Sequence, residues 1–303
     1  MQMGASISHL VAKIFRRNWP DCRVLLAAGA GAGLAAVFNA PIAGAIFVLE
    51  ELVRKFETRI AIAALGASGA AIWVARMLLG SAPTFHVAPL FYIGSGTGVL
   101  FLLLGVFAGF LGIVYNRTLL GTLEAADRFS KHPVEFRAAA IGAVVGMLAW
   151  FVPGWIGSGE PLIQRTLVSG GTLATLAVLF IVRLGLGSIS YAAGTPGGLM
   201  APILALGAQF GLVSGILCSH GLPTLGIQPE AFAVVGMAAL LTAITRTPLT
   251  SIVLVIEMTA SFTMFLPMLI ACFAAMFVPT LLHNPPIYDS LRERTLRIKG
   301  KSG

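Results

Sequence analysis

The sequence predicts an all-α polytopic membrane protein whose helices are uneven in length, some of them too short to span a bilayer. Three observations predict this class: an apolar composition, long runs without charge, and an internal repeat. Hydrophobic residues make up 57% of the 303 residues and charged residues only 11%, whereas soluble domains carry about 25% charged residues. Too few charged side chains are present to cover the surface of a soluble protein of this length.

The charged residues are gathered in blocks. The segment from Leu184 to Pro229 contains no Asp, Glu, Lys or Arg, although about 20 apolar residues suffice for one membrane-spanning helix. The net charge of +8 comes largely from basic clusters beside apolar runs, at Lys13–Arg17, Arg54–Lys55 and Arg292–Lys301. Such clusters are typical of the cytoplasmic edges of membrane proteins. We therefore expect a multi-pass protein of the plasma (inner) membrane, which lies in the lipid bilayer and binds no nucleic acid.

Residues that would hold a cofactor or perform catalysis are not recognisable. Cys22, Cys218 and Cys272 have neither paired nor metal-ligand spacing, and the five histidines are scattered. The Gly-x-Gly runs at 29–31 and 94–96 lack the strand and the acidic residue of a dinucleotide-binding fold. The sequence therefore predicts no cofactor, no metal and no enzyme activity.

Apolar runs separated by Gly and Pro divide the chain into about eleven helices and a short amphipathic tail helix. In chain order they cover about 5–17, 22–36, 42–56, 58–80, 92–120, 134–152, 171–188, 200–218, 230–244, 249–260, 263–283 and, for the tail, 287–297. Helices such as 42–56 and 249–260 are too short for a hydrocarbon core of about 30 Å. Short helices interrupted by Gly or Pro in matching positions indicate a transporter site.

An internal repeat is the most informative feature of the sequence. A shift of 207 positions aligns residues 29–50 with residues 236–257 without a gap. Each copy is a helix of small residues, then a break ending in Pro at the first helical turn, then an apolar helix ending in Glu. The identical pairs include Gly29 and Gly236, Ala36 and Ala243, Pro41 and Pro248, and Glu50 and Glu257. This register predicts an internal duplication.

The duplication predicts that the chain begins within its first repeat. Gly197–Pro202 precedes the second copy, and the corresponding entry of the first copy would lie before Met1. We expect one transmembrane domain over residues 1–303, truncated at its N-terminus. Residues 1–80 would end the first repeat, residues 81–284 would form the second, and residues 285–303 would form an ion-facing helix and a cytoplasmic tail.

The glycine-rich segment Gly194–Pro202 opens an apolar helix that runs to about Cys218. Glycines keep side chains away, and the first amides of a helix have no intrahelical acceptor. They present about half a positive charge to an anion. In a membrane, Lys or Arg would cost more to bury and would hold the anion too tightly. The alternative is a helix-breaking turn between two spans, and this segment alone does not separate the two interpretations.

Four segments resemble the CLC family of chloride channels and chloride/proton exchangers. Gly198–Pro202 resembles its G-x-F-x-P chloride-binding signature, and Gly29–Leu52 resembles its G-L-A-A-x-F-N-A-P segment that ends in two glutamates. Thr247–Thr259 is similar to its P-L-T-x-x-x-x-x-E-M-T segment, and Pro285–Tyr288 to its P-x-Y stretch. The resemblance covers essentially the whole chain.

This resemblance implies two inverted halves, a homodimer with one pore per subunit, and chloride as the transported ligand. The chloride-binding residues would be Gly198, Leu199, Met200 and Tyr288. The amides of Leu199 and Met200 would face the ion, and the Tyr288 hydroxyl would donate to it. The alternative for Tyr288 is an aromatic residue of the membrane interface.

The resemblance also assigns a proton-transfer role to Glu51, which aligns with the internal glutamate of the exchangers. A partly desolvated carboxyl at the end of an apolar helix can pick up a cytosolic proton. The alternative is a solvated helix-end charge beside Arg54 and Lys55.

Glu50 and Glu257 occupy equivalent helix ends in the two copies. We interpret them as structural helix-end groups, paired with Arg76 or Arg246, rather than as transport residues.

The sequence departs from the family pattern in two ways. Met200 replaces the bulky Phe of the chloride signature. The family's G-S-G-x-P serine motif and its G-[KR]-E-G-P gating glutamate are not recognised, and we expect both upstream of Met1. The implied function is chloride transport by chloride/proton exchange. A passive chloride channel and a non-transporting fragment remain the alternatives.

Overall fold

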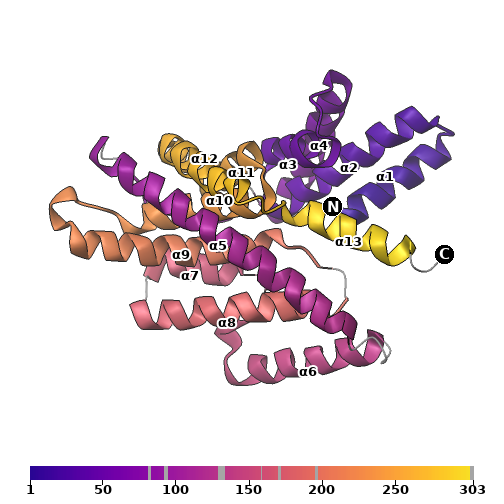
Figure 1. The fold of residues 1–303 in the computed structure, drawn as a ribbon. Helices are drawn as coiled ribbons and strands as arrows, with labels where there is room; N and C mark the ends of the chain where they lie inside the picture. Colours follow the sequence, from indigo (N-terminus) through magenta and orange to yellow (C-terminus); the bar gives the residue numbers. More distant parts are fainter. Residues whose placement is uncertain are drawn as a thin grey trace. The chain divides into compact units, whose positions relative to one another are not determined.

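The computed structural model describes residues 1–80, 83–91, 95–128, 134–157, 159–169, 172–194 and 197–300, and every regular element in these ranges is a helix. The all-α prediction is confirmed (Figure 1). The α-helices are α1 (Gln2–Ile14), α2 (Trp19–Phe38), α3 (Pro41–Phe47), α4 (Thr58–Leu79), α5 (Ser95–Arg128), α6 (Val134–Phe151), α7 (Glu160–Ser169), α8 (Leu173–Ala192), α9 (Met200–Gly221), α10 (Pro229–Thr245), α11 (Pro248–Thr259), α12 (Phe265–Leu281) and α13 (Ile287–Gly300). A π-helix, Val48–Val53, continues α3, and 3-10 turns lie at Pro153–Trp155, Pro223–Leu225 and Phe262–Met264.

The helices are uneven in length, as predicted. In the described part of the chain, six are long and apolar enough to cross a membrane, namely α2, α4, α5, α8, α9 and α12 with the turn before it. The apolar helices α10 and α11 are shorter, with 17 and 12 residues, and α3 has only 7. The described chain therefore combines helices long enough to span a bilayer with apolar helices that are too short to do so.

One helix, α7, is missing from the sequence prediction. It has only ten residues and carries Gln164 and Arg165 in its middle, so that its apolar periodicity is weak. The prediction also ends α5 too early, at about residue 120. The helix continues to Arg128 because Leu123 is still buried, at 7% exposure.

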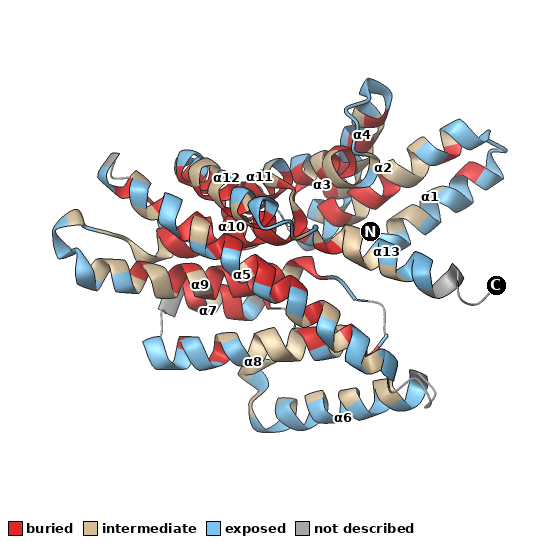
Figure 2. Ribbon diagram, viewed as in Figure 1, coloured by how far each residue is buried: buried red, intermediate tan, exposed pale blue. Residues whose placement is uncertain are grey.

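The described residues form two compact units. Met1–Val87 and Thr247–Phe265 make the first, which contains α1 to α4 and α11. Ala88–Arg246 and Leu266–Gly303 make the second. In the second unit, α10 lies against α5, α7 and α9, and its side chains from Ala231 to Thr245 are all buried (Figure 2). An apolar helix buried on all sides is the core of this unit.

The two copies of the repeat have the same local backbone geometry. Asn39, the residue that follows α2, has a φ of 51°, and the equivalent Arg246, which follows α10, has a φ of 65°. Both values lie in the left-handed region, which ends a helix. Pro41 and Pro248 then start α3 and α11, where the missing N–H of proline costs nothing.

Equivalent glycines allow two close helix contacts, one in each unit. A Cβ atom on Gly29 of α2 would lie 2.5 Å from the Gly4 carbonyl oxygen of α1, and one on Gly236 of α10 would lie 2.5 Å from the Gly207 carbonyl oxygen of α9. No side chain fits at these distances, so the backbones touch. Small residues at such contacts are typical of helix packing in membranes.

Candidate anion-binding site

The segment that the sequence analysis proposed as an anion site is the start of α9. Helix α9 begins at Met200 after the N-cap residue Leu199, whose side chain makes no capping hydrogen bond. The side chains of Leu199 and Met200 are both 5% exposed, so they point into the protein. Gly197 and Gly198 are exposed. Thr195 and Pro196, in the same predicted motif, lie outside the described residues.

A cavity of about 230 Å³ opens at this helix start. Gly197, Gly198 and Leu199 line it together with Pro202. A Cβ atom on Gly198 would meet no described atom within 4 Å, which shows that free space begins directly at the predicted G-x-F-x-P position. Met200 is not among the described residues that line the cavity.

The remaining polar lining suits an anion. Tyr115 of α5 and Ser190 and Tyr191 of α8 bring hydroxyl groups to the wall, and Arg183 of α8 brings a cation. None of the described lining residues is acidic. Hydroxyl and guanidinium groups can donate to an anion, and the positive end of the α9 dipole adds to their field.

Arg183 is a functional candidate that the sequence analysis did not single out. It is half-buried, and its Nε atom is fully buried without a hydrogen-bond partner in the described part of the chain. A charged residue inside an apolar spanning helix is uncommon and marks an ion pathway more often than a structural position. This single Arg within α8 was the signal that could have identified it.

Tyr288 lies in the first turn of α13 and is half-buried. Its phenol group interacts electrostatically with that of Tyr115, which lines the cavity. Tyr288 itself is not among the described lining residues. The structure therefore brings Leu199 and Tyr115 to one cavity, and Tyr288 interacts with Tyr115.

Two side-chain contacts hold the segment before Tyr288. Arg246 donates to the Asn284 carbonyl at 2.8 Å, and Asn116 of α5 donates to the Pro285 carbonyl at 3.3 Å. Arg246 also donates to the Ala243 carbonyl at the end of its own helix. The sequence prediction paired Arg246 with a glutamate, but the structure pairs it with these two carbonyls.

Glu51 lies in the π-helix of the first unit. Its side chain is only 9% exposed, and its Oε1 atom lies 3.0 Å from the Arg54 guanidinium. The carboxyl is thus largely removed from water, and the neighbouring cation is Arg54, as the sequence suggested. Short π-helical stretches are frequent at functional sites. The proton-transfer role of Glu51 stays a prediction.

Glu50 and Glu257 have a structural role, but their main partners are backbone amides. The Glu50 carboxylate accepts from the amides of Leu249 and Thr250 at 3.1 and 2.7 Å, at the start of α11. The Glu257 carboxylate accepts from the amides of Ile42 and Ala43 at 3.1 and 2.8 Å, at the start of α3. The two equivalent helices therefore lie antiparallel, and each carboxylate caps the other helix. Of the two arginines suggested as partners, Arg76 interacts with Glu257 electrostatically.

The chain does contain a G-S-G-x-P pattern, at Gly157–Pro161 in its second half. The inference from the sequence that the chain lacks this motif is therefore wrong. Gly157 lines the cavity with a φ of 113°, and Gly159 is buried with a φ of 99°. A Cβ atom on Gly159 would lie 3.2 Å from Arg183 Nη1. Ser158 lies outside the described residues. A literal search of the whole chain would have found the pattern.

Comparison with known proteins identifies the family of the chain. A family model described as voltage gated chloride channel matches residues 1–280. The H(+)/Cl(-) exchange transporter ClcA of Vibrio parahaemolyticus is 38% identical over 303 residues, which are 98% of this chain and 65% of that protein. The protein of the same name from Yersinia pestis is 35% identical, over 98% of this chain and 63% of that protein. The chain thus spans just under two thirds of the length of these relatives.

Solved structures show the same fold. The crystal structure of a slow cyanobacterial Cl-/H+ antiporter superposes with a TM-score of 0.91 at 31% identity, over 98% of this chain and 70% of that chain. A CLC-type fluoride/proton antiporter shares the fold at 22% identity, with a TM-score of 0.78 over 91% of this chain and 68% of that chain. Because the family model matches residues 1–280, the chain belongs to the voltage gated chloride channel family, which is the CLC family.

Proposed function

We propose that the chain carries the chloride-binding part of a chloride/proton exchanger in the plasma (inner) membrane. The observation that carries this proposal is the start of α9, which opens onto a cavity lined by glycine, hydroxyl groups and an arginine. The relatives named H(+)/Cl(-) exchange transporters support exchange rather than passive conduction. We expect a homodimer, as the family resemblance implies.

Neutral donors account for a site that both binds and releases chloride. The amides of Leu199 and Met200 supply the positive end of α9, and the phenol hydroxyls of Tyr115 and Tyr288 would complete the shell. An ion must enter such a site and also leave it, so many weak donors serve better than a close ammonium group. Arg183 then raises the local chloride concentration from the cavity wall.

Exchange requires a proton carrier, and Glu51 is the proposed one. A carboxyl that is largely removed from water can carry a proton between the cytosol and the protein interior. In this proposal Glu51 binds a cytosolic proton and passes it inward, while chloride moves the other way.

Reconstitution of the 303-residue chain in liposomes tests the proposal. A chloride gradient should drive proton movement against the proton gradient, which a pH electrode and a chloride electrode record together. Glu51→Gln should retain chloride flux and lose proton flux. Glu57→Gln is the matched control, since Glu57 is exposed and makes no capping hydrogen bond. Unchanged proton flux in Glu51→Gln would remove Glu51 from the mechanism.

The same experiment separates the two alternatives. Chloride flux without any proton movement in the unmodified chain would identify a passive channel. Chloride binding without flux would identify a chain that needs further protein to transport. The second outcome is a real alternative because the chain spans just under two thirds of the length of its relatives.

A further inference from the structure

We propose that Asp127, in the last turn of α5, is a positioning residue for Tyr288 and acts through Arg294 of α13. The inference rests on the proposed function, in which the Tyr288 hydroxyl donates to chloride. All three residues belong to the second compact unit.

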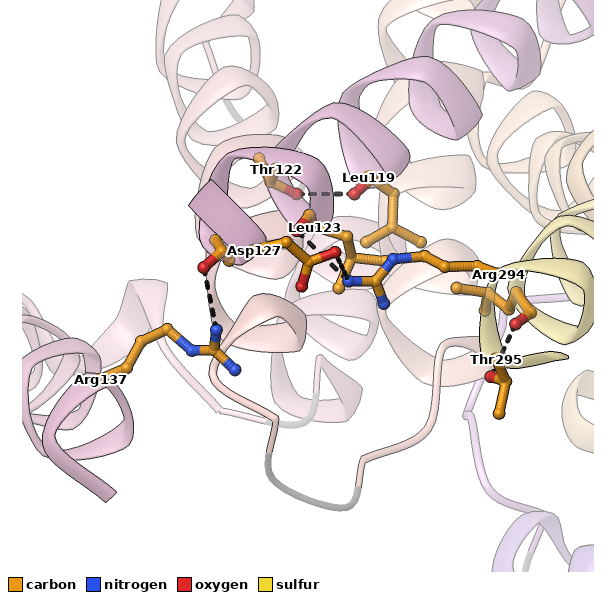
Figure 3. A network of polar contacts seen from close by, with 9 residues as sticks. Leu119, Thr122, Leu123, Asp127, Arg137, Arg294 and Thr295 are labelled. Atoms are coloured by element: carbon orange, nitrogen blue, oxygen red, sulfur yellow. Dashed lines mark hydrogen bonds and ion pairs between the residues drawn. The ribbon is translucent and has the colours of Figure 1, made fainter. Parts of the chain in front are cut away.

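The end of α5 binds two arginines (Figure 3). Arg294 lies 2.5 Å from Asp127 Oδ2 and donates to the Leu123 carbonyl at 3.4 Å. Arg137 of α6 donates to the Ala126 carbonyl at 3.1 Å. The last carbonyls of a helix lack intrahelical donors, and the negative end of the helix dipole attracts cations. The C-terminal end of α5 is thus a docking point for α13.

The beginning of α13 is attached to the same helix. Asn116 of α5 donates to the Pro285 carbonyl at 3.3 Å, and Ile287 is fully buried. Asn116 and Asp127 are separated by about 16 Å along α5. An attachment at one end alone would leave α13 free to pivot about it. The second attachment, at Arg294, sets the direction of α13 and with it the orientation of Tyr288.

The ion pair between Arg294 and Asp127 is too exposed to act mainly through stability. The Arg294 side chain is 25% exposed and the Asp127 side chain 49%. Ion pairs with this exposure contribute little to the stability of a fold. Removing the pair should therefore change the orientation of α13 without unfolding the chain.

A direct electrostatic effect is the rival explanation. Arg294 interacts electrostatically with Tyr191, which lines the cavity. If the charge of Arg294 acted on chloride directly, Asp127→Asn would strengthen chloride binding and Arg294→Gln would weaken it. If the pair positions Tyr288, both variants weaken chloride binding.

Chloride titration by isothermal calorimetry of the full chain in detergent tests the proposal. Asp127→Asn, Arg294→Gln and Tyr288→Phe should each raise the chloride Kd about fivefold, the factor that one neutral hydrogen bond carries. In the Tyr288→Phe background, Asp127→Asn should have no further effect. The exchanged pair Asp127→Arg with Arg294→Asp should recover most of the affinity. Glu293→Gln is the control, because its partner is the exposed Arg297 at 3.8 Å.

Each of the following results would overturn the proposal. The first is that Asp127→Asn and Arg294→Gln change the chloride Kd in opposite directions. The second is that the effects of Asp127→Asn and Tyr288→Phe on the Kd are additive. The third is that Glu293→Gln raises the Kd as much as Asp127→Asn does. If Tyr288→Phe weakens binding and Asp127→Asn does not, the positioning role fails and the proposed function stands. If the unmodified chain binds no chloride, the proposed function fails first.

A measurement without chloride tests the positioning step itself. A spin label on Arg292→Cys, at an exposed position of α13, should become more mobile when Asp127→Asn is added. An unchanged spectrum of the spin label would show that the ion pair does not restrain α13. This result would overturn the proposal regardless of the chloride titrations.

Discussion

Helices α11 and α9 both begin after a break in the chain, but their first amides are used differently. At α11, Glu50 accepts from the amides of Leu249 and Thr250 and from the Thr250 hydroxyl, at 2.7 to 3.1 Å. At α9, the N-cap Leu199 offers no side-chain acceptor, and the helix start lines a cavity. The first amides of α11 therefore meet a fixed anion, whereas the start of α9 lies beside a cavity.

This difference separates a structural use of helix-start amides, at α11, from the ion-binding use that we propose for α9. A helix start attracts an anion because its amides are unsatisfied and its dipole end is positive. Where the chain supplies its own carboxylate, the attraction joins two helices permanently. Where the chain leaves the start open, the attraction is available to an ion from solution. The following predictions test the two starts, from the largest expected effect to the smallest.

Glu50→Ala should lower the free energy of unfolding by about 3 kcal/mol, because two amides and a hydroxyl at the start of α11 lose their charged acceptor. Glu50→Gln should lower the free energy of unfolding by about half as much, since the glutamine amide oxygen still accepts hydrogen bonds from the same donors. Denaturant unfolding in detergent, followed by tryptophan fluorescence, measures both. Glu57→Ala is the control, because Glu57 is exposed and makes no capping hydrogen bond. Equal stability of the Glu50 and Glu57 variants would refute the structural role.

Gly198→Ala should raise the chloride Kd about tenfold or more while leaving stability unchanged. A methyl group there meets no described atom within 4 Å, so it enters the cavity and blocks access to the helix start; a tenfold loss corresponds to about 1.4 kcal/mol. Calorimetric titration with chloride measures the effect. Gly185→Ala is the matched control: its Cβ is equally unhindered, and Gly185 is not among the described residues that line the cavity. Unchanged affinity in Gly198→Ala would place the ion elsewhere.

Arg183→Gln should raise the chloride Kd about fivefold, because a half-buried cation on the cavity wall attracts the ion through a medium that screens less than water. The effect should persist in high concentrations of an impermeant salt, since buried charges are screened weakly. Arg165→Gln, at an exposed position of α7, is the control. Equal losses of chloride affinity in the two variants would mean that the net charge of the protein, and not the position of Arg183, determines the affinity.

Local patterns allowed much of the fold to be predicted. The prolines at 41 and 248 mark two helix starts, and both are confirmed as the first residues of α3 and α11. The helix α7 was missed because its ten residues are too few and too polar for periodicity to stand out. Arg183 was missed although it is the single Arg of an apolar helix, and only the structure shows that it lines one cavity with residues of other helices. Tyr115, for example, comes from α5.

The sequence by itself determined the membrane solvent, most of the helices, the repeat and the position of the helix start proposed to bind the anion, because these depend on composition and on spacing along the chain. Only the tertiary structure decided which groups meet. Glu50 and Glu257 read as helix-end charges in the sequence, yet each caps a helix that lies about 200 positions away. Contacts of that kind depend on how helices pack in three dimensions, and local spacing carries no information about them.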